Sequence, residues 1–122
     1  MYSKLDYFKE HEFKCKCGVC DLDVVMDRRL LVALDRMRRR FGKPIVINSG
    51  IRCPDHNEDE GGVKNSSHLT GKASDIKVET DRDRFKLIGL AIEMGIPRIG
   101  IGLGYLHLDV DTSKNYPRIW LE

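Results

Sequence analysis

The sequence predicts an α+β fold with a mainly antiparallel sheet of four or five short strands and two main helices. Two stretches, 27–41 and 80–94, repeat apolar residues at helical spacing. Short apolar stretches joined by turns supply the strands and favour hairpin connections. With 122 residues the chain can bury one hydrophobic core of ordinary size, so we expect a single domain over residues 1–122.

The composition, with 41% hydrophobic and 33% charged residues, is ordinary for a soluble globular protein. The net charge of +2 arises from nearly balanced totals, so it does not indicate nucleic-acid binding and would equally suit an anionic polymer. The N-terminal residues lack the apolar core of a secretory signal, and no apolar run approaches the ~20 residues of a membrane helix. We therefore expect a monomer synthesised in the cytoplasm, without membrane insertion.

Residues 1–26 are predicted to form a short helical or irregular lead that contains a cysteine-rich turn. The cysteines of the chain are Cys15, Cys17, Cys20 and Cys53. In a reducing compartment, such uneven spacing indicates metal binding or free thiols rather than disulfides. Four thiolates could form a structural zinc site, although the usual pair of C-x2-C motifs is missing. Partly buried thiols in a turn are an equally good interpretation.

The first helix is predicted over Asp27–Phe41, with Asp27 as its N-cap and Gly42 and Pro44 ending it. Its apolar stripe consists of Leu30, Leu34, Met37 and Phe41. Its outer face carries Arg36, Arg38, Arg39 and Arg40. These arginines are interpreted as a solvated basic helix end, where cations interact favourably with the helix dipole, and a nucleic-acid patch is the alternative.

A short strand over Ile45–Asn48 leads into a long loop, Ser49–Ser67, and a loop of this length in a compact domain is usually functional. A second strand is predicted over Lys72–Glu79. Its alternation places Asp75 on the polar face, opposite the apolar face that carries Ile76.

The second helix is predicted from the capping box at Thr80 to about Met94. Its buried stripe is expected to consist of Phe85, Ile88 and Ile92.

Two further strands, Arg98–Leu103 and Tyr105–Val110, are expected to form a hairpin, and Arg118–Leu121 an edge strand. Alternation along the second of these strands puts Tyr105, His107 and Asp109 on one face, with Leu106, Leu108 and Val110 directed to the core.

Two His/Asp pairs thus lie on polar strand faces: His68 with Asp75, and His107 with Asp109. If the two strands are neighbours, His68, Asp75 and His107 meet and offer nitrogen and oxygen donors to one ion. Three protein ligands leave a coordination position open for water, which is the arrangement of catalytic rather than structural zinc. The other histidines, His11 and His56, are interpreted as ordinary hydrogen-bonded residues.

These motifs belong to a longer pattern, which reads Ser49-Gly50-x-Arg52, Asn57, Gly61-Gly62, Ser66-x-His68-x2-Gly71-x-Ala73-x-Asp75 and His107-x-Asp109. The pattern resembles the zinc D-alanyl-D-alanine carboxypeptidase family, which includes phage endolysins that cleave L-alanyl-D-glutamate bonds. That family shares its fold with the hedgehog signalling domain. The similarity extends from about Asp27 to Asp111.

The resemblance implies that His68, Asp75 and His107 hold Zn2+, with an activated water as the fourth ligand. The implied function is a zinc metallopeptidase that cleaves peptidoglycan stem peptides, as a D-Ala-D-Ala carboxypeptidase or an L-Ala-D-Glu endopeptidase. Such an enzyme would act on the cell wall, after phage-type release from the cytoplasm.

The resemblance also implies a substrate-binding group. Arg52 is expected to bind a substrate carboxylate or to polarise the scissile carbonyl, because its planar guanidinium matches carboxylate oxygens. Ser66 is expected to orient His68 or the loop, and Asn57 to shape the loop that aims Arg52.

The chain departs from the family at the general base. Well-known relatives carry an acidic residue shortly before the second histidine, where this chain has the stretch 103–106 without a carboxylate. Asp109 is therefore expected to serve as the general base. The alternative is that Asp109 accepts a hydrogen bond from a ligand imidazole and fixes its tautomer. Tyr105 is a candidate donor to the oxyanion.

Two functions of other classes compete with the peptidase. The first is a catalytically inactive zinc-binding module on the same scaffold, which binds a partner or the cell wall. The second is a structural or DNA-associated protein, suggested by the cysteines and the arginine-rich helix, but it leaves the His68–Asp75 motif unexplained.

Overall fold

The computed structural model describes residues 4–20 and 22–122. The helices are η2 (Glu10–Phe13), α1 (Arg28–Phe41), α2 (Pro54–Asp59), η3 (Ser67–Thr70) and α3 (Asp81–Glu93), where η denotes a 3-10 helix. The strands are β1 (Ile47–Ser49), β2 (Ala73–Lys77), β3 (Arg98–Ile101), β4 (Tyr105–Asp109) and β5 (Arg118–Leu121). None of the helices in these residues is long and apolar enough to cross a bilayer.

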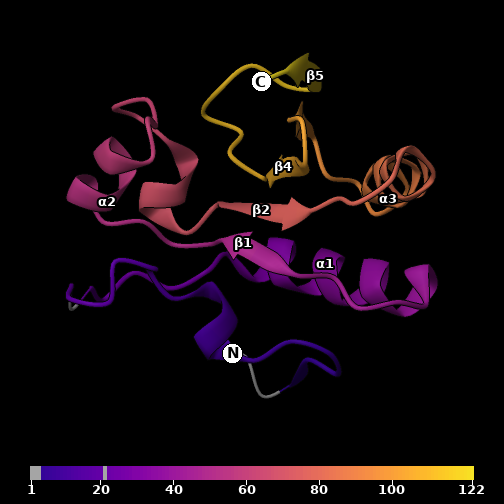
Figure 1. Ribbon diagram of the computed structural model, residues 1–122, viewed down its shortest axis with the longest axis horizontal. Helices are drawn as coiled ribbons and strands as arrows, with labels where there is room; N and C mark the ends of the chain where they lie inside the picture. Colours follow the sequence, from indigo (N-terminus) through magenta and orange to yellow (C-terminus); the bar gives the residue numbers. More distant parts are fainter. Residues whose placement is uncertain (1–3, 21) are drawn as a thin grey trace.

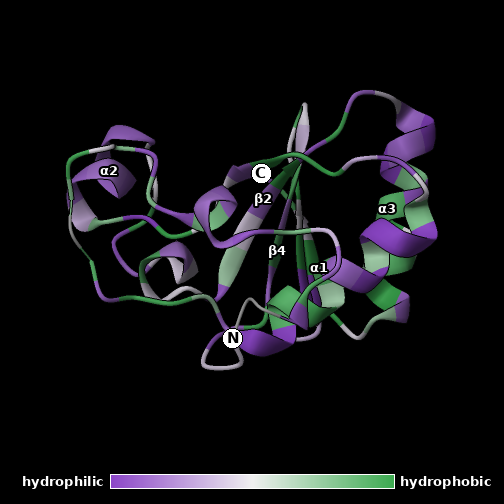
Figure 2. Ribbon diagram, turned by 90° about the horizontal axis from the view of Figure 1, so that it is seen from below, coloured by the Kyte–Doolittle hydropathy of each residue, from purple (hydrophilic) through white to green (hydrophobic). Residues whose placement is uncertain are grey.

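The strands form one five-stranded sheet in the order β1-β2-β4-β3-β5. All neighbouring pairs are antiparallel except β3 and β5, which run parallel. The predicted α+β fold with a mainly antiparallel sheet is confirmed. Figure 2 shows α3 on one side of the strands and α2 on the opposite side.

The hydrophobic core lies between the sheet and the helices α1 and α3, which pack on each other. Its central members are Leu30, Leu34 and Met37 of α1, Ile76 of β2, Leu87 of α3 and Leu106 and Leu108 of β4. The predicted ends of α1 are confirmed. The Asp27 carboxylate accepts a hydrogen bond from the Arg29 N–H, and Gly42 ends the helix with a φ of 77°.

The buried stripe predicted for α3 is wrong for Phe85 and Ile92, whereas Ile88 is partly buried against the core. Phe85 is 82% exposed and Ile92 is 56% exposed, whereas Leu87 and Ala91 are buried. Both sets of residues have helical spacing, so periodicity alone cannot choose between them. The packing of α3 against α1 selects the face that carries Leu87 and Ala91.

The stretch predicted as a continuous loop, 49–67, contains the short helix α2. This helix begins with Pro54 at its first position, where proline is favourable, and the Cys53 sulfur accepts the His56 N–H as a cap. The stretch has little apolar periodicity, which concealed the helix in the sequence.

The N-terminal lead, residues 4–20 of the described chain, is fixed to the fold at two places. The Asp35 carboxylate on α1 accepts hydrogen bonds from the backbone N–H groups of Asp6 and Tyr7. Further along, Phe13 is fully buried and its carbonyl accepts the Ile51 N–H at 2.9 Å. The indigo lead therefore runs beside β1 (Figure 1) and directly contacts the loop that follows this strand.

The sheet register brings polar residues of four strands into neighbouring rows. One row runs from Asp75 through His107 and Gly100 to Trp120, and the next from Ala73 through Asp109 and Arg98 to Arg118. Because side chains alternate between faces along a strand, both rows project from the face opposite the apolar core. This face carries the site.

Candidate functional site

The structure brings together the three residues that the sequence predicts as metal ligands. His68 lies in η3, Asp75 in β2 and His107 in β4. The Asp75 Oδ1 atom is 3.2 Å from His68 Nε2 and 3.0 Å from His107 Nδ1. The two imidazole rings approach edge to face, with centroids 5.2 Å apart.

The turn that presents His68 explains two further residues of the motif. The Ser66 hydroxyl accepts the His68 N–H at 3.2 Å, which caps η3. Gly71 ends η3 with a φ of 73°, and a Cβ at this position would lie 2.2 Å from the Val25 carbonyl oxygen. Only glycine suits this backbone conformation and this close approach.

The outer nitrogen of each imidazole is bound to an acceptor. His68 Nδ1 is 2.7 Å from the Gly50 carbonyl oxygen, and His107 Nε2 is 2.7 Å from Asp109 Oδ2. A carbonyl and a carboxylate accept hydrogen bonds, so these nitrogens carry the protons. The nitrogens that face Asp75 are then lone-pair donors in the neutral rings.

Three electron-pair donors therefore converge on one point, and such groups repel one another unless a proton or a cation lies between them. Ligands about 2.0–2.1 Å from a tetrahedral zinc ion lie about 3.4 Å from each other. The distances of 3.0 Å and 3.2 Å at Asp75 are close to this value. The residues fit a divalent zinc ion with three protein ligands, which would bind it through the inner donor atoms of His68, Asp75 and His107.

The charges at this point agree with cation binding. Burial alone would raise the pKa of Asp75, but His107 and His68, whose inner nitrogens donate to its carboxylate when the rings are protonated, hold the pKa well below its usual range. Burial lowers the pKa of His107, and its contacts with Asp109 and Asp75 reverse this effect and raise the pKa to about 9. The field that favours a proton on His107 also attracts a metal cation.

Asp109, the expected general base, is fully buried, and both of its oxygens are engaged. Oδ2 contacts His107, while Oδ1 accepts hydrogen bonds from Arg98 Nε at 2.8 Å and from the Asp111 N–H at 3.1 Å. This geometry favours the alternative role, in which Asp109 fixes the tautomer and orientation of His107.

Arg98 is a site residue that sequence reasoning missed. It lies directly opposite Asp109 in the β3–β4 register, donates to the Asn115 carbonyl at 2.5 Å and stacks over the Trp120 ring at 4.8 Å. The predicted hairpin could have revealed this residue, because strand pairing across the turn near Gly104 places Arg98 opposite Asp109 on the polar face.

Arg52 is held by three hydrogen bonds rather than extended toward solvent. Its guanidinium donates to Ser49 Oγ at 3.0 Å, to Asn57 Oδ1 at 3.3 Å and to Asp75 Oδ2 at 3.1 Å. Arg52 thus fixes the Asp75 oxygen that does not face the histidines. Asn57 lies behind Arg52 and also donates to the Val63 carbonyl at 2.8 Å, so it supports the loop.

A cavity of about 420 Å3 lies beside the three predicted ligands. Its wall includes the predicted site residues Arg52, Ser66, His68, Asp75, Tyr105, His107 and Asp109, and further charged residues Glu60, Arg98, Lys114, Arg118 and Glu122. Asn57 is the one predicted site residue that is set back from this wall.

The far wall of the cavity contains a second missed residue, Glu122. Its Oε1 accepts the Tyr105 hydroxyl at 3.1 Å and its Oε2 accepts the Trp120 indole N–H at 2.5 Å. Burial and the neighbouring Glu122 raise the pKa of Tyr105 to about 12, so the hydroxyl keeps its proton and directs it to Glu122. Alternation along the last strand could have revealed Glu122 from the sequence, since it places Glu122 on the same face as Arg118 and Trp120.

Gly100 allows the indole of Trp120 to approach the site. A Cβ on Gly100 would lie 3.0 Å from the Trp120 ring and 2.9 Å from the Glu122 carboxylate. Without that atom, the Trp120 ring lies 5.6 Å from the His107 ring, measured between centroids. Trp120 thereby covers His107 on the side away from Asp75.

A comparison with protein-family models finds a match to the family described as Peptidase M15, over residues 6–110. The match includes the three predicted ligands, Arg52 and Asp109, and ends before Trp120 and Glu122. It confirms the resemblance that the sequence motifs indicate. A search of curated proteins found no match to this chain.

Proposed function

The chain belongs to the peptidase M15 family, and we propose that it is a zinc peptidase that cleaves peptidoglycan stem peptides. The observation that carries this proposal is the convergence of His68 Nε2, Asp75 Oδ1 and His107 Nδ1 at the edge of a cavity, with the outer nitrogen of each imidazole already bound. When bound there, zinc would supply an activated water and would polarise the scissile carbonyl.

Cationic side chains on the cavity wall support a carboxylate-bearing peptide as the substrate. Its wall carries the cations Arg52, Arg98, Lys114 and Arg118. Arg52 uses three of its N–H groups on Ser49, Asn57 and Asp75, and a guanidinium has five. The remaining donors of Arg52 bind a substrate carboxylate or the scissile carbonyl oxygen. Stem peptides of peptidoglycan carry such carboxylates. The proposed enzyme therefore acts at the cell wall, and it is proposed to reach the wall by phage-type release.

Proton transfer needs a carboxylate that reaches the cavity. Asp109 is buried against Arg98 and His107, and it acts by holding His107. Glu122 lines the cavity and is oriented by Tyr105 and Trp120. Glu122 is therefore proposed as the general base of the hydrolysis. Tyr105 orients Glu122, and it becomes a donor to the oxyanion when this hydrogen bond is released.

Metal content and cell-wall cleavage, measured together, test the proposed function. His68→Ala should lose one zinc ion per chain and should no longer clear a suspension of purified cell walls. His11→Ala, a change at an exposed histidine outside the site, is the matched control and should behave as the wild type. Chelation should abolish wild-type activity, and added zinc should restore it.

Two outcomes would contradict the proposal. A wild-type hydrolase that is insensitive to chelation would exclude the zinc mechanism. Zinc bound at His68 without cleavage of walls or isolated stem peptides would favour the inactive zinc-binding module. Peptides that end in D-Ala-D-Ala, compared with peptides that contain an internal L-Ala-D-Glu bond, distinguish a carboxypeptidase from an endopeptidase.

A further inference from the structure

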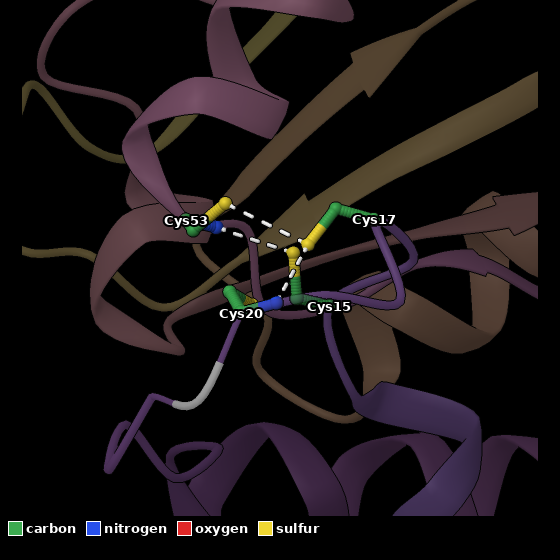
Figure 3. Close-up of side chains that lie close together, drawn as sticks. All are labelled: Cys15, Cys17, Cys20 and Cys53. Carbon is green, nitrogen blue, oxygen red and sulfur yellow. Dashed lines mark hydrogen bonds between the residues drawn. The ribbon is translucent and has the colours of Figure 1, made fainter.

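A second cluster of metal-binding side chains lies outside the cavity. Cys15, Cys17 and Cys20 come from the N-terminal lead, and Cys53 comes from the loop between β1 and α2. Their four sulfur atoms all lie within 4.8 Å of one another, and the structure has them as free cysteines. Figure 3 shows the side chains of Cys15, Cys17 and Cys53 directed toward one another across the gap between the two segments.

The sulfur spacing is that of ligands around one tetrahedral ion. With a zinc–sulfur bond of about 2.3 Å, neighbouring sulfurs of a tetrahedral site lie about 3.8 Å apart. The sulfurs of Cys17 and Cys53 are 3.9 Å apart. A disulfide would require a separation of about 2.05 Å.

Backbone N–H groups surround the sulfurs. The Cys53 N–H donates to Cys15 Sγ at 3.3 Å, the Cys20 N–H to Cys17 Sγ at 3.4 Å, and the His56 N–H to Cys53 Sγ at 3.4 Å. A neutral thiol is a weak acceptor, whereas a metal-bound thiolate carries charge that such donors stabilise. The donors thus suit thiolates better than thiols.

The charges within the cluster agree with this geometry. The Val19 N–H, followed by the thiol and N–H of Cys20, lowers the pKa of Cys17 to about 6. The contact with Cys17, together with burial, raises the pKa of Cys20 to about 12. Neighbouring thiolates repel one another, and a cation between them offsets this repulsion.

We propose that Cys15, Cys17, Cys20 and Cys53 form a structural zinc site that joins the N-terminal lead to the loop preceding α2. Four protein ligands complete a tetrahedral shell and leave no position for water, so this site is structural. Each ligating thiol releases its proton to solvent, and no oxidation is involved. Thiolate ligands with tetrahedral spacing select zinc over magnesium or calcium.

The zinc-bound cysteines hold a segment on which the active site depends. Cys53 follows Arg52, and two residues before Arg52 the Gly50 carbonyl accepts the hydrogen bond of His68 Nδ1. The lead contacts the same loop through the Phe13 carbonyl, which accepts the Ile51 N–H. Zinc binding at the cysteines would therefore stabilise the backbone that orients His68 and Arg52.

Native mass spectrometry of the full chain, purified under reducing conditions in the presence of zinc, tests this site separately from the proposed catalytic zinc. The wild type should carry two zinc ions, His68→Ala one, and His68→Ala combined with Cys17→Ser none. Asp75→Asn should match the count of His68→Ala. A single wild-type zinc that His68→Ala removes and Cys17→Ser retains would overturn the cysteine site and leave the proposed function intact. A single wild-type zinc that is lost in Cys17→Ser and retained in His68→Ala would overturn the catalytic zinc site and leave the cysteine site intact.

Cobalt provides a readout that does not need a cysteine variant to fold. His68→Ala loaded with Co2+ should show thiolate-to-cobalt charge-transfer bands and the strong visible bands of a tetrahedral complex, and zinc should displace them. Zinc should also protect all four thiols from alkylation in this variant. Absence of the charge-transfer bands, iron in the protein as isolated, or a mass that shows disulfides would each overturn the proposal.

Discussion

The two clusters of candidate metal ligands in this chain are built in different ways. His68, Asp75 and His107 are placed by η3 and by two paired strands, and each contacts a further partner: Gly50, Arg52 or Asp109. The cysteines lie on a lead and a loop, and backbone N–H groups donate hydrogen bonds to the sulfurs of Cys15, Cys17 and Cys53. The fold holds the first cluster in place, whereas the second is proposed to hold two segments of the fold together through its zinc ion.

The number and type of ligands lead to the same distinction. Two imidazoles and one carboxylate beside a cavity would leave a bound zinc ion with an open coordination position, as catalysis requires. Four sulfurs would complete the coordination shell of a zinc ion at the cysteines. Loss of the first metal should therefore affect activity more than stability, and loss of the second should affect stability more than chemistry.

The largest expected effect is that of Asp75→Asn. The substitution keeps the side-chain volume and an acceptor for Arg52, but it removes the charged oxygen that both histidines face. We expect hydrolysis at background level and one zinc ion fewer per chain, with the cysteine zinc retained. Asp81→Asn, at a fully exposed side chain, is the control. An active Asp75→Asn enzyme would contradict the assigned ligand set.

A smaller loss is expected for Glu122→Gln, because a general base contributes about 10²–10⁴-fold to the rate. Zinc content should not change, so the loss should appear in kcat measured on zinc-saturated protein. Glu79→Gln is the control, since Glu79 is exposed and lies away from the cavity wall. If Asp109→Asn lost as much of kcat while zinc stayed bound and Glu122→Gln did not, Asp109 would be the base, as the sequence suggested.

Asp109→Asn should mainly weaken zinc binding. Partners that orient a metal-bound histidine are worth about 10–100-fold in metal affinity. Asp109 accepts from His107 and compensates the buried Arg98, so the variant should lose zinc to a competing chelator more readily than the wild type. Saturating zinc should restore most of its activity. An unchanged zinc affinity would show that His107 does not depend on Asp109.

Much of this architecture could be predicted from the sequence, because alternation along a strand assigns each side chain to one face. It placed Asp75 and His107 on polar faces, and their pairing in the β2–β4 register brings them together. It also placed Leu106 and Leu108 in the core.

What the sequence did not reveal depends on which segments become neighbours. Arg98 joins the site through the residue register of the predicted hairpin, and Glu122 through the parallel pairing of β3 with β5, which no local pattern specifies. The stripe with Phe85 and the stripe with Leu87 have equivalent helical spacing, so only packing against α1 distinguishes them. The four cysteines likewise meet only because the lead lies against the loop that carries Cys53.

The smallest expected effect concerns Asp111, which supports the turn that presents His68. Its carboxylate accepts the hydroxyl hydrogen bonds of Ser67, at 2.7 Å, and Ser113, at 2.5 Å. Burial opposes ionisation, but these bonds outweigh it and lower the pKa of Asp111 below 3.8. A lowered folded-state pKa stabilises the protein above the unfolded value, about 3.9, and this stabilisation disappears as the pH falls through the folded-state pKa.

Asp111→Asn should therefore reduce the free energy of unfolding by about 1 kcal/mol at neutral pH, the size of a typical hydrogen-bond contribution. The difference from the wild type should shrink below about pH 4. Denaturant unfolding of zinc-free protein across this range measures it. The hydrogen bonds of Asp111 do not depend on a bound metal. The difference in unfolding free energy between Asp111→Asn and the wild type should therefore be the same with and without zinc. A difference that appears only in the zinc-loaded protein would mean that the metal organises the His68 turn, as it is proposed to organise the cysteine segments.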